Sequence, residues 1–332
     1  MNTPRMQKFF KNKTVMITGG TGSFGEYLVR ALLPLPVKKI IIFSRDEWKQ
    51  HVLKYELEEY SHKLLFIIGD VRNKDTLLAT TRGVDIIYHA AAMKHVPISE
   101  ENPMEAVYTN VVGAYNLKEA AIQNNIPSVI IISTDKAIKS VNVMGMTKAI
   151  QERIMLSNHS ESNTRFVCVR FGNVAGSRGS VIPLFHDQLI KDKPLTLTDT
   201  TMTRYLITLD DAIELIMTAT LEGKGREIYV KKMPVCRIVD VADVMIEAYN
   251  KPKTYPIKYV GIREGEQLYE SLVSEEEMRR VKETDKYFIV YPYGTPGLPL
   301  LKKPLEEYRT DHQKSFMSKS AIKEILKKTG WI

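Results

Sequence analysis

The residues whose types and spacing best suit catalysis lie between Ser133 and Lys148, where the order is S-T-D-K-A-I-K-S-V-N-V-M-G-M-T-K. A hydroxyl, a carboxyl and an amine follow one another directly at Thr134, Asp135 and Lys136. A carboxyl group beside an amine can give and take protons at neighbouring points, as general acid–base catalysis requires. The same residues can also form a plain ion pair, with the threonine capping the next segment. The cluster therefore indicates proton-transfer chemistry, with the ion pair as the alternative.

Two elements must position this cluster. An almost fully apolar run predicts a buried strand at Ser128–Ser133, and the following segment predicts a helix at Asn142–Asn158. Met144 and Lys148 are four residues apart, so they share one face of that helix. We expect the chemistry on this face, although methionine cannot transfer a proton and side-chain packing is an equal alternative for it.

The first half of the chain alternates short apolar runs with longer amphipathic ones. The apolar runs lack polar–apolar alternation, as expected for parallel strands covered on both faces. Strand–helix repetition predicts an α/β fold with a Rossmann-type, doubly wound parallel sheet. The predicted strands are Thr14–Thr18, Lys39–Ser44, Leu64–Ile68, Asp85–His89, Ser128–Ser133 and Phe166–Phe171, and the predicted helices are Gly22–Leu33, Glu47–Tyr60, Pro103–Gln123 and Asn142–Asn158.

A glycine-rich turn, G-G-T-G-S-F-G at residues 19–25, follows the first predicted strand and precedes the first predicted helix. Small residues permit a tight turn, and backbone N–H groups beside a helix N-terminus favour a bound diphosphate. A glycine triplet alone is a weak signal. The strand before it and the helix after it favour a dinucleotide site over a purely structural turn.

The end of the second predicted strand, Phe43-Ser44-Arg45-Asp46, bears on which dinucleotide binds. A carboxylate there would bind the ribose of NAD, whereas the guanidinium of Arg45 suits the 2′-phosphate of NADP. We predict NADP, with NAD less favoured through Asp46 and a surface salt bridge as the other role for Arg45. Asp70 is predicted to meet the adenine, and the small side chains of Ala90-Ala91-Ala92 to let the cofactor pass closely.

After about residue 174 glycine and proline break the pattern. Thr208 and Asp211 predict a capped helix start, and further helices are predicted at Val239–Tyr249 and Ser320–Lys328. We therefore predict two units, 1–174 as mainly a cofactor-binding Rossmann domain and 175–332 as mainly a smaller α+β substrate-binding lobe. The cleft between them is the expected ligand site.

Composition bounds the class of protein. The 332 residues are 44% hydrophobic and 26% charged, as in ordinary soluble globular proteins. The net charge of +8 comes from mixed acids and bases, which favours pockets for small anions over nucleic acid. Cys168 and Cys236 are isolated and match no metal or disulfide framework. With neither a signal peptide nor an apolar run of membrane-spanning length, we expect a cytoplasmic protein without membrane or metal partners.

Taken together, the glycine turn, G-D-V-R at 69–72, H-A-A-A at 89–92 and S-T-D-K at 133–136 resemble the extended short-chain dehydrogenase/reductase family. More narrowly, the chain resembles the UDP-N-acetylglucosamine 4,6-dehydratases of surface-polysaccharide and modified-sugar biosynthesis. The most specific segments are Thr18–Gly25, Phe43–Glu47, His89–Pro97, Ser133–Lys136, Phe171–Pro183, Thr201–Tyr205 and Arg263–Glu266. The resemblance spans roughly residues 12–275, and the last fifty residues match less clearly.

The resemblance implies an internal redox reaction on UDP-N-acetylglucosamine. Hydride leaves C4 for NADP, a base removes the C5 proton, an acid helps the C6 hydroxyl leave as water, and hydride returns to C6. The product is a UDP-4-keto-6-deoxy-N-acetylhexosamine. Asp135 is implied as the acid, Lys136 as the base, Thr134 as the ligand of the C4 oxygen and Lys148 as the ligand of the nicotinamide ribose. A dry pocket or a nearby cation is expected to lower the pKa of Lys136 enough for this role.

The resemblance also carries over binding roles. It implies cofactor binding by Gly19, Thr21, Gly22, Ser23, Phe24, Gly25, Ser44, Arg45, Asp70, Val71, Ala90, Ala91, Ala92, Lys94, Asn110 and Lys148. It implies substrate binding by Lys94, Asn173, Val181, Thr196, Arg204, Arg263 and Glu266. For the arginines and Glu266, surface ion pairs are nearly as good an interpretation, and His95 is predicted to be structural.

Met144 departs from the family, which mostly has tyrosine at this position. Some configuration-retaining dehydratases and some dehydratase/5-epimerases resemble this chain in having methionine there. We therefore expect an active enzyme in which deprotonation of the C4 hydroxyl is relayed through water, Thr134 or Lys136. Retention of configuration at C5 is predicted from Met144 and from the region after residue 275, which does not resemble the 5-epimerising relatives.

Three other hypotheses remain open. One is an inverting dehydratase/5-epimerase on the same substrate, and another is a UDP-sugar 4-epimerase. The acid–base pair at Asp135 and Lys136 argues against the simple epimerase, which does not need it. A third is a non-catalytic NADP-binding protein, against which the retention of Asp135, Lys136 and Lys148 argues. The resemblance further implies a homo-oligomer, a dimer or larger, joined through helices near 103–123 and 142–158.

Overall fold

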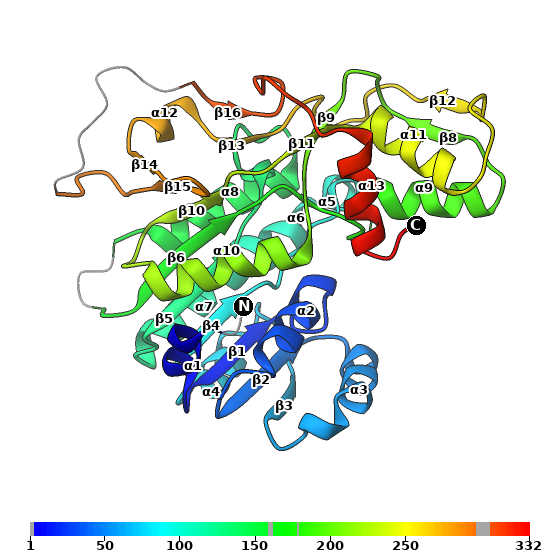
Figure 1. Cartoon of the computed structure of the whole chain (residues 1–332). Coiled ribbons are helices and arrows are strands. Elements are labelled where there is room, and N and C mark those ends of the chain that lie inside the picture. The colour runs from blue at the N-terminus through cyan, green and yellow to red at the C-terminus, as the bar shows by residue number, and fades with distance from the viewer. Residues whose placement is uncertain (1–2, 159–161, 178, 297–305) are drawn as a thin grey trace.

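The computed structural model describes residues 3–158, 162–177, 179–296 and 306–332 (Figure 1). Arg178, within the predicted Phe171–Pro183 motif, lies outside the described residues. The chain forms one large sheet with helices on both faces and, beside it, a group of helices and short strands. The predicted α/β, Rossmann-type class is confirmed.

The large sheet, in the part of the chain that the structure describes, has nine strands in the order β14-β15-β10-β6-β5-β4-β1-β2-β3. The strands that pair in parallel are β1 Thr14–Thr18, β2 Lys39–Ser44, β3 Leu64–Ile68, β4 Ile86–His89, β5 Ser128–Ile132, β6 Arg165–Arg170 and β10 Ile228–Lys231. The strand β15 Tyr287–Val290 pairs antiparallel with both β10 and β14 Val281–Glu283. The six predicted strands are confirmed to within one residue at each end. Val15, Met16 and Ile17 are fully buried, because helices cover both faces of the sheet.

The helices of this layer precede the first strand or connect later ones. They are α1 Pro4–Phe10, α2 Ser23–Leu32, α3 Glu47–Glu56, α4 Lys74–Thr80, α5 Val96–Glu101, α6 Pro103–Ala106, α7 Gly113–Gln123, α8 Val143–Leu156 and α10 Leu209–Glu222. Two predicted helices differ in detail. The Glu47–Tyr60 prediction ends at Glu56 and continues as a short 3-10 turn, and the Pro103–Gln123 prediction contains a π-helical stretch at Val107–Val112.

Side-chain caps fix where key helices begin. The Thr208 hydroxyl accepts from the Asp211 N–H while Asp211 accepts from the Thr208 N–H, so the predicted capping box of α10 is confirmed. Asn142 caps α8 by accepting from the Gly145 N–H at 2.8 Å. A Cβ on Gly145 would lie 2.2 Å from the Lys136 carbonyl oxygen. Glycine at this position therefore lets α8 pack directly on the chain that follows β5.

The second half of the chain builds a smaller cluster and also returns to the large sheet. The cluster contains α9 Val181–Ile190, α11 Ile238–Ala248 and α13 Lys319–Lys328, with β8 Leu195–Leu197 paired to β12 Ile257–Tyr259. The remaining short elements are β7 Asn173–Val174, β9 Thr203–Ile207, β11 Val235–Arg237, β13 Ser271–Val273, α12 Glu275–Met278 and β16 Tyr308–Arg309. Because β10, β14 and β15 join the large sheet, the division at residue 174 stays a prediction.

A buried ionic triad ties these parts together. Arg170 on β6 donates from Nε to Glu152 of α8 at 2.7 Å and from both terminal nitrogens to Glu277 of α12, at 2.8 and 2.9 Å. Burial disfavours the charged form of Glu277, but the nearby Arg170 guanidinium favours it more strongly and lowers the pKa of Glu277. Removing one partner of such a group leaves an unpaired buried charge. The triad therefore fixes α8 against the sheet and against the segment that leads to α12.

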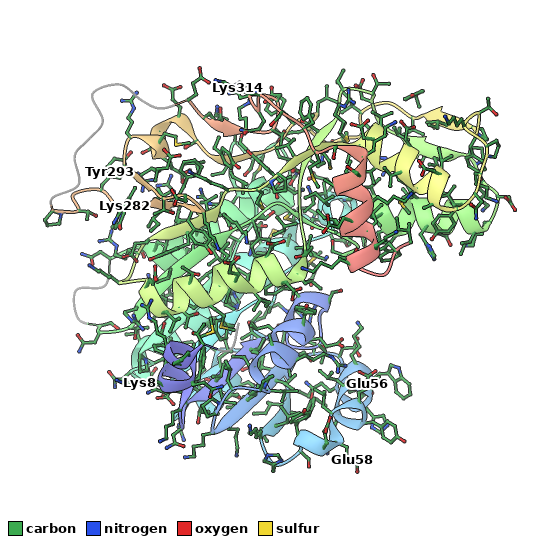
Figure 2. The ribbon with its side chains drawn as sticks, in the orientation of Figure 1. Lys8, Glu56, Glu58, Lys282, Tyr293 and Lys314 are labelled. Carbon is green, nitrogen blue, oxygen red and sulfur yellow. The ribbon has the colours of Figure 1, made fainter. Side chains whose placement is uncertain are left out.

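Charged side chains such as Lys8, Glu56, Glu58 and Lys282 point outward from the ribbon (Figure 2). Within the described ranges, no helix is both long and apolar enough to cross a membrane. No group of His, Cys, Asp and Glu side chains suited to a metal is found among those same residues.

Candidate active site

The glycine turn between β1 and α2 forms one wall of a groove of about 300 Å³. Gly19 has φ of +69°, and a Cβ added to it would lie 2.8 Å from the Ala91 nitrogen. A Cβ on Gly25 would lie 2.3 Å from the Gly19 carbonyl oxygen, and Gly22 is the N-cap of α2. Only glycine satisfies such approaches. The turn thus forms a narrow backbone cradle at a helix N-terminus, which fits a dinucleotide diphosphate.

Most residues predicted to bind the cofactor lie together in this groove. Its lining includes Gly19, Thr21, Gly22, Ser44, Arg45, Asp70, Val71, Ala90, Ala91 and Ala92. Ser23, Phe24, Gly25, Lys94 and Asn110 do not line it. Phe24 packs on Phe171 with ring centroids 5.6 Å apart, and Asn110 is fully buried, where it bonds both backbone groups of Met93. The direct binding roles of these five residues stay predictions.

The two charged candidates for cofactor choice have different partners. Asp46 accepts from the Lys49 N–H at 3.0 Å as the N-cap of α3, and it pairs with the Lys49 ammonium at 2.6 Å. Arg45 lies 3.6 Å from Asp70, and its side chain is 54% exposed. Burial opposes the charge on Asp70, but Arg72 and Arg45 outweigh it and lower the carboxyl pKa. Arg45 is therefore held by an exposed ion pair beside the groove, while Asp46 already caps a helix.

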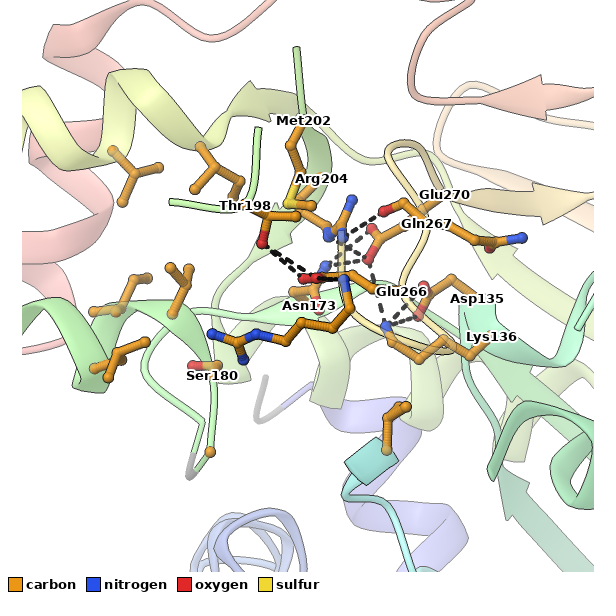
Figure 3. Close-up of a pocket in the computed structure, with 18 of the residues that line it drawn as sticks. Asp135, Lys136, Asn173, Ser180, Thr198, Met202, Arg204, Glu266, Gln267 and Glu270 are labelled. Atoms are coloured by element: carbon orange, nitrogen blue, oxygen red, sulfur yellow. Dashed lines mark hydrogen bonds and ion pairs between the residues drawn. The ribbon is translucent and has the colours of Figure 1, made fainter. Parts of the chain in front are cut away.

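A larger cavity of about 610 Å³ lies between the sheet and the smaller cluster (Figure 3). Its lining comes from the turn after β5, from the chain around β7 and α9, from β8 and β9, and from residues 263–270. The Asn142 amide donates to the Gly265 carbonyl at 2.7 Å, which joins the start of α8 to the 263–270 segment. Segments more than a hundred residues apart thus meet around one space.

Asp135 and Lys136 form a short 3-10 turn directly after β5 and line this cavity. The Lys136 ammonium lies 3.0 Å from Asp135 Oδ2, and the Thr134 hydroxyl donates to Asp135 Oδ1 at 2.7 Å. The Asp135 side chain is 2% exposed and that of Lys136 is 29% exposed. An acid and an amine are therefore held in contact, and the amine reaches the cavity.

Glu270 completes this cluster, and sequence reasoning missed it. Its buried carboxylate lies 3.4 Å from the Lys136 ammonium and 3.2 Å from Arg204 Nε. It also accepts from the Asn173 amide at 2.7 and 2.9 Å and from the Tyr205 N–H at 3.1 Å (Figure 3). Glu270 follows no recognisable motif, and 134 residues separate it from Lys136. Local spacing in the sequence therefore contains no signal for it.

The charges of this cluster set its proton affinities. Burial and the nearby Asp135 charge raise the pKa of Glu270. Burial alone would raise the pKa of Asp135 too, but Lys136 and the Thr134 hydroxyl outweigh it and lower that pKa. Burial would lower the pKa of Lys136, but two carboxylates outweigh it and raise that pKa. The expectation that a dry pocket lowers the pKa of Lys136 is wrong, because its pocket is lined by acids.

The predicted substrate ligands fall into two groups. Asn173, Val181, Thr196, Arg204, Arg263 and Glu266 line the larger cavity, whereas the exposed Lys94 does not. Arg204 donates to the backbone carbonyls of residues 203, 267 and 268 and forms an ion pair with Glu270, so its guanidinium organises the cavity wall. Glu266 accepts from the Thr198 hydroxyl at 3.1 Å. His95, predicted to be structural, also lines the cavity.

Met144 and Lys148 are both buried, at 4% and 5% exposure, and neither lines one of the two cavities. The Lys148 ammonium donates to the Ile132 carbonyl at 2.6 Å and to Gln151. Burial lowers the pKa of Lys148 to about 8, although Glu152 partly offsets it. Met144 and Lys148 therefore share one face of α8, as predicted, but this face is buried and is not part of either cavity.

Comparison with known proteins assigns the chain to a family. The family model described as polysaccharide biosynthesis protein matches residues 15–292. The chain belongs to this family. A protein named UDP-glucose 4-epimerase from Rickettsia prowazekii is 43% identical over 333 residues, covering 96% of each chain. A protein from Methanocaldococcus jannaschii named an uncharacterised membrane protein is 42% identical, covering 98% of this chain and 99% of its own.

Solved structures agree with the fold. The X-ray structure of Pen from Bacillus thuringiensis is 36% identical, with a TM-score of 0.89, and covers 96% of this chain and 99% of its own. DesIV, a dTDP-glucose 4,6-dehydratase from Streptomyces venezuelae solved with NAD, has a TM-score of 0.71 at 22% identity, covering 77% and 86%. At this identity, the similarity to DesIV shows that the two chains share a fold.

Proposed function

We propose that this protein is an enzyme acting on nucleotide sugars, and specifically a UDP-N-acetylglucosamine 4,6-dehydratase. The observation that carries the proposal is the contact between Asp135 and Lys136, 3.0 Å apart on the wall of a cavity of about 610 Å³. Eliminating water from neighbouring carbons needs one group that takes a proton and another that gives one. This pair supplies both at adjacent atoms.

The glycine cradle fits NADP, which when bound would accept a hydride from C4 and return it to C6. The resulting 4-ketone acidifies the C5 proton. Lys136 Nζ then takes that proton, the C6–O bond breaks with its electron pair on oxygen, and Asp135 protonates the leaving hydroxyl to give water. Thr134 is proposed to hold the C4 oxygen, since its hydroxyl already contacts Asp135 at 2.7 Å.

The resting pair has the wrong protons for this step, because Asp135 is ionised and Lys136 is charged. Moving one proton from Nζ to Oδ2 across 3.0 Å yields both the neutral amine and the carboxylic acid. Displacement of water by a substrate favours this neutral form, since a drier pocket penalises two charges more than none. Glu270 and Arg204 hold the pair in place without being consumed.

Substrate binding is proposed at the outer part of the cavity. Asn173, Val181, Thr196, Arg263 and Glu266 all line this cavity and are proposed to contact the UDP-sugar. Exposed Arg263 suits the diphosphate better than Arg204, whose nitrogens already donate to the protein. A guanidinium bound to fixed carbonyls would lose those bonds on reaching for a phosphate.

We propose NADP as the cofactor. Support comes from Arg45, half-exposed at the groove, and from Asp46, whose carboxylate is engaged in capping α3. NAD is the alternative, which the neighbouring structures solved with NAD favour. Binding titrations with each dinucleotide distinguish them, and Arg45→Leu should weaken NADP binding but leave NAD binding unchanged.

A UDP-sugar 4-epimerase is the second candidate, because relatives at 43% identity are named UDP-glucose 4-epimerase. Epimerisation needs no acid and base at C5 and C6. The test incubates the protein and NADP with UDP-N-acetylglucosamine, or with UDP-glucose, and measures product mass and sugar configuration. Loss of one water supports the dehydratase, whereas a C4 epimer of unchanged mass overturns it. Asp135→Asn is the matched control and should prevent water loss.

Configuration at C5 is proposed to be retained. Met144 has a thioether, which carries no transferable proton, and it is buried at 4% exposure, so it supplies no second proton donor to the sugar. Reprotonation by Lys136, on the face from which it took the proton, retains configuration. Proton NMR of the 4-keto product tests this, and an inverted C5 would identify a dehydratase/5-epimerase.

A homodimer is proposed through the helices of residues 103–123 and 143–156. Met104, Tyr108 and Tyr115 expose 53%, 44% and 49% of their surface at helical spacing, and Met146 and Ile150 on α8 expose 49% and 47%. A second copy that packs on the same face would bury both stripes. Light scattering tests this, and Tyr115→Lys with Ile150→Lys should yield monomers.

A further inference from the structure

A chain of buried hydrogen bonds leads away from Lys148. Its ammonium donates to Gln151 of α8, one turn further along the same helix. The Gln151 amide nitrogen lies 3.1 Å from Nε2 of His89, the last residue of β4. Gln151 is fully buried, and His89 is 1% exposed. Two polar residues without an assigned role therefore join the helix of Lys148 to the sheet.

The chain continues to the glycine turn. His89 Nδ1 lies 2.8 Å from the hydroxyl of Thr18, the last residue of β1, and that hydroxyl also accepts from the Ala91 N–H at 3.3 Å. Thr18 is fully buried and directly precedes Gly19. Ala91 and Gly19 both line the smaller groove. The hydrogen bonds thus connect Lys148 with two walls of the proposed cofactor site.

The direction of each bond follows from the first. An ammonium only donates, so the Gln151 oxygen must face Lys148 and the amide nitrogen must face His89. That nitrogen donates, so His89 Nε2 carries no proton and accepts. The neutral ring then has its proton on Nδ1 and donates to Thr18. The Lys148 ammonium therefore sets the tautomer of His89 through the Gln151 side chain that lies between them.

The surroundings keep His89 neutral. Burial and then the Lys148 charge lower its pKa to about 3. Glu152 and Cys168 act on Lys148, and Thr18 and Gln151 are the polar groups in contact with the ring. A charged imidazole would place a second donor against the Gln151 amide. The chain of bonds therefore has one stable arrangement at neutral pH.

We propose that Gln151 and His89 are positioning residues that hold Lys148 in one orientation for the cofactor. This rests on the proposed role of Lys148 at the nicotinamide ribose. Lys148 lines neither cavity, and the Ile132 carbonyl and the Gln151 oxygen accept two of its N–H groups, so the third is assigned to the proposed contact with the ribose. A neutral amine can still donate to both fixed acceptors. Gain or loss of a proton by Lys148 therefore occurs at this third position, where a hydroxyl can bind.

The first test is NMR of protein labelled with ¹⁵N-histidine, with neither cofactor nor substrate. We expect His89 to carry its proton on Nδ1 and to remain neutral well below pH 6. In Gln151→Glu the new carboxylate only accepts, so His89 Nε2 should gain a proton while the other histidines do not change. A native His89 protonated on Nε2, or a Gln151→Glu spectrum identical to the native one, overturns the proposal.

The second test measures dissociation constants for NADP and NAD. Gln151→Met removes the acceptor and should weaken binding roughly tenfold, whereas Gln151→Glu keeps an acceptor and should restore it. Gln188→Met, a control in α9, also removes a buried glutamine and should leave cofactor affinity unchanged. Equal affinities for native and Gln151→Met proteins overturn the proposal. Both tests omit the sugar substrate, so a failed dehydratase assay does not affect them.

Discussion

The two cavities are built in opposite ways. The narrow groove lies at the ends of the neighbouring strands β1, β2, β3 and β4, where glycines and alanines let backbone segments approach one another closely and Arg45 and Asp70 also line the space. Charged side chains from distant segments form the larger cavity, where Asp135, Lys136, Arg204 and Glu270 contact one another. The difference indicates that added bulk should damage the groove, whereas a lost charge should damage the larger cavity.

Removing the amine of the larger cavity should have the largest effect. Lys136→Ala eliminates the proposed C5 base, so turnover should fall by at least about 10³-fold, at the upper part of the range for general-base catalysis. Cofactor affinity should stay within twofold of native, roughly the limit of significance for a binding measurement. Lys139→Ala, three residues on and 57% exposed, is the control and should keep native turnover. Unchanged turnover in Lys136→Ala would remove it from the mechanism.

Added bulk in the groove should come next. Gly25→Ala places a Cβ 2.3 Å from a backbone oxygen, so the cradle must open and cofactor affinity should fall by roughly two orders of magnitude. Gly83→Ala is the control, because Gly83 also resists substitution through its φ of +71° but has open space around it. It should lower the free energy of unfolding by about 1 kcal/mol without changing affinity. Calorimetric titration and chemical denaturation measure the two quantities.

Neutralising Glu270 should have an intermediate effect that depends on pH. Glu270 raises the pKa of Lys136, so Glu270→Gln should lower that pKa. Because the proposed mechanism needs one proton shared between Lys136 and Asp135, activity should decline when Lys136 loses its proton to solvent, and in Glu270→Gln this decline should begin at a lower pH than in the native enzyme. The maximal rate should fall, since the amide no longer pairs with Arg204. A profile shifted to higher pH would contradict this arrangement of charges, and Glu264→Gln, exposed in the same cavity, is the control.

The smallest effect should come from the packing behind the larger cavity. Trp331 covers Gly176, since a Cβ on that glycine would lie 1.7 Å from the indole nitrogen, and it packs edge-on against His186 at 5.4 Å. Trp331→Ala should loosen the chain between β7 and α9 and raise KM for the nucleotide sugar several-fold. Cofactor affinity should not change, because the groove lies elsewhere. Steady-state kinetics at saturating cofactor measure the difference, and an unchanged KM would show that this packing does not support the site.

The two cavities also differ in how much of each can be predicted from the sequence. The strands, the glycine turn and the adjacency of Asp135 and Lys136 are local, so spacing alone predicts them, and the groove contains most of its predicted residues. Glu270 and the Gln151–His89 contact depend on tertiary packing between distant segments, so no spacing rule finds them. The predicted direction for the pKa of Lys136 is wrong because burial, which lowers this pKa, is outweighed by two carboxylates. The adjacent Asp135 contributes most, and Glu270, from a segment with no motif, adds to it.

Isotope transfer from C4 tests the central claim most directly. UDP-N-acetylglucosamine carrying deuterium at C4 is incubated with the enzyme and catalytic NADP, and the product is examined by NMR. Internal redox followed by elimination predicts a 4-keto product whose C6 methyl group carries that deuterium. Deuterium found again at C4, in a sugar that has lost no water, would contradict the dehydratase and identify an epimerase.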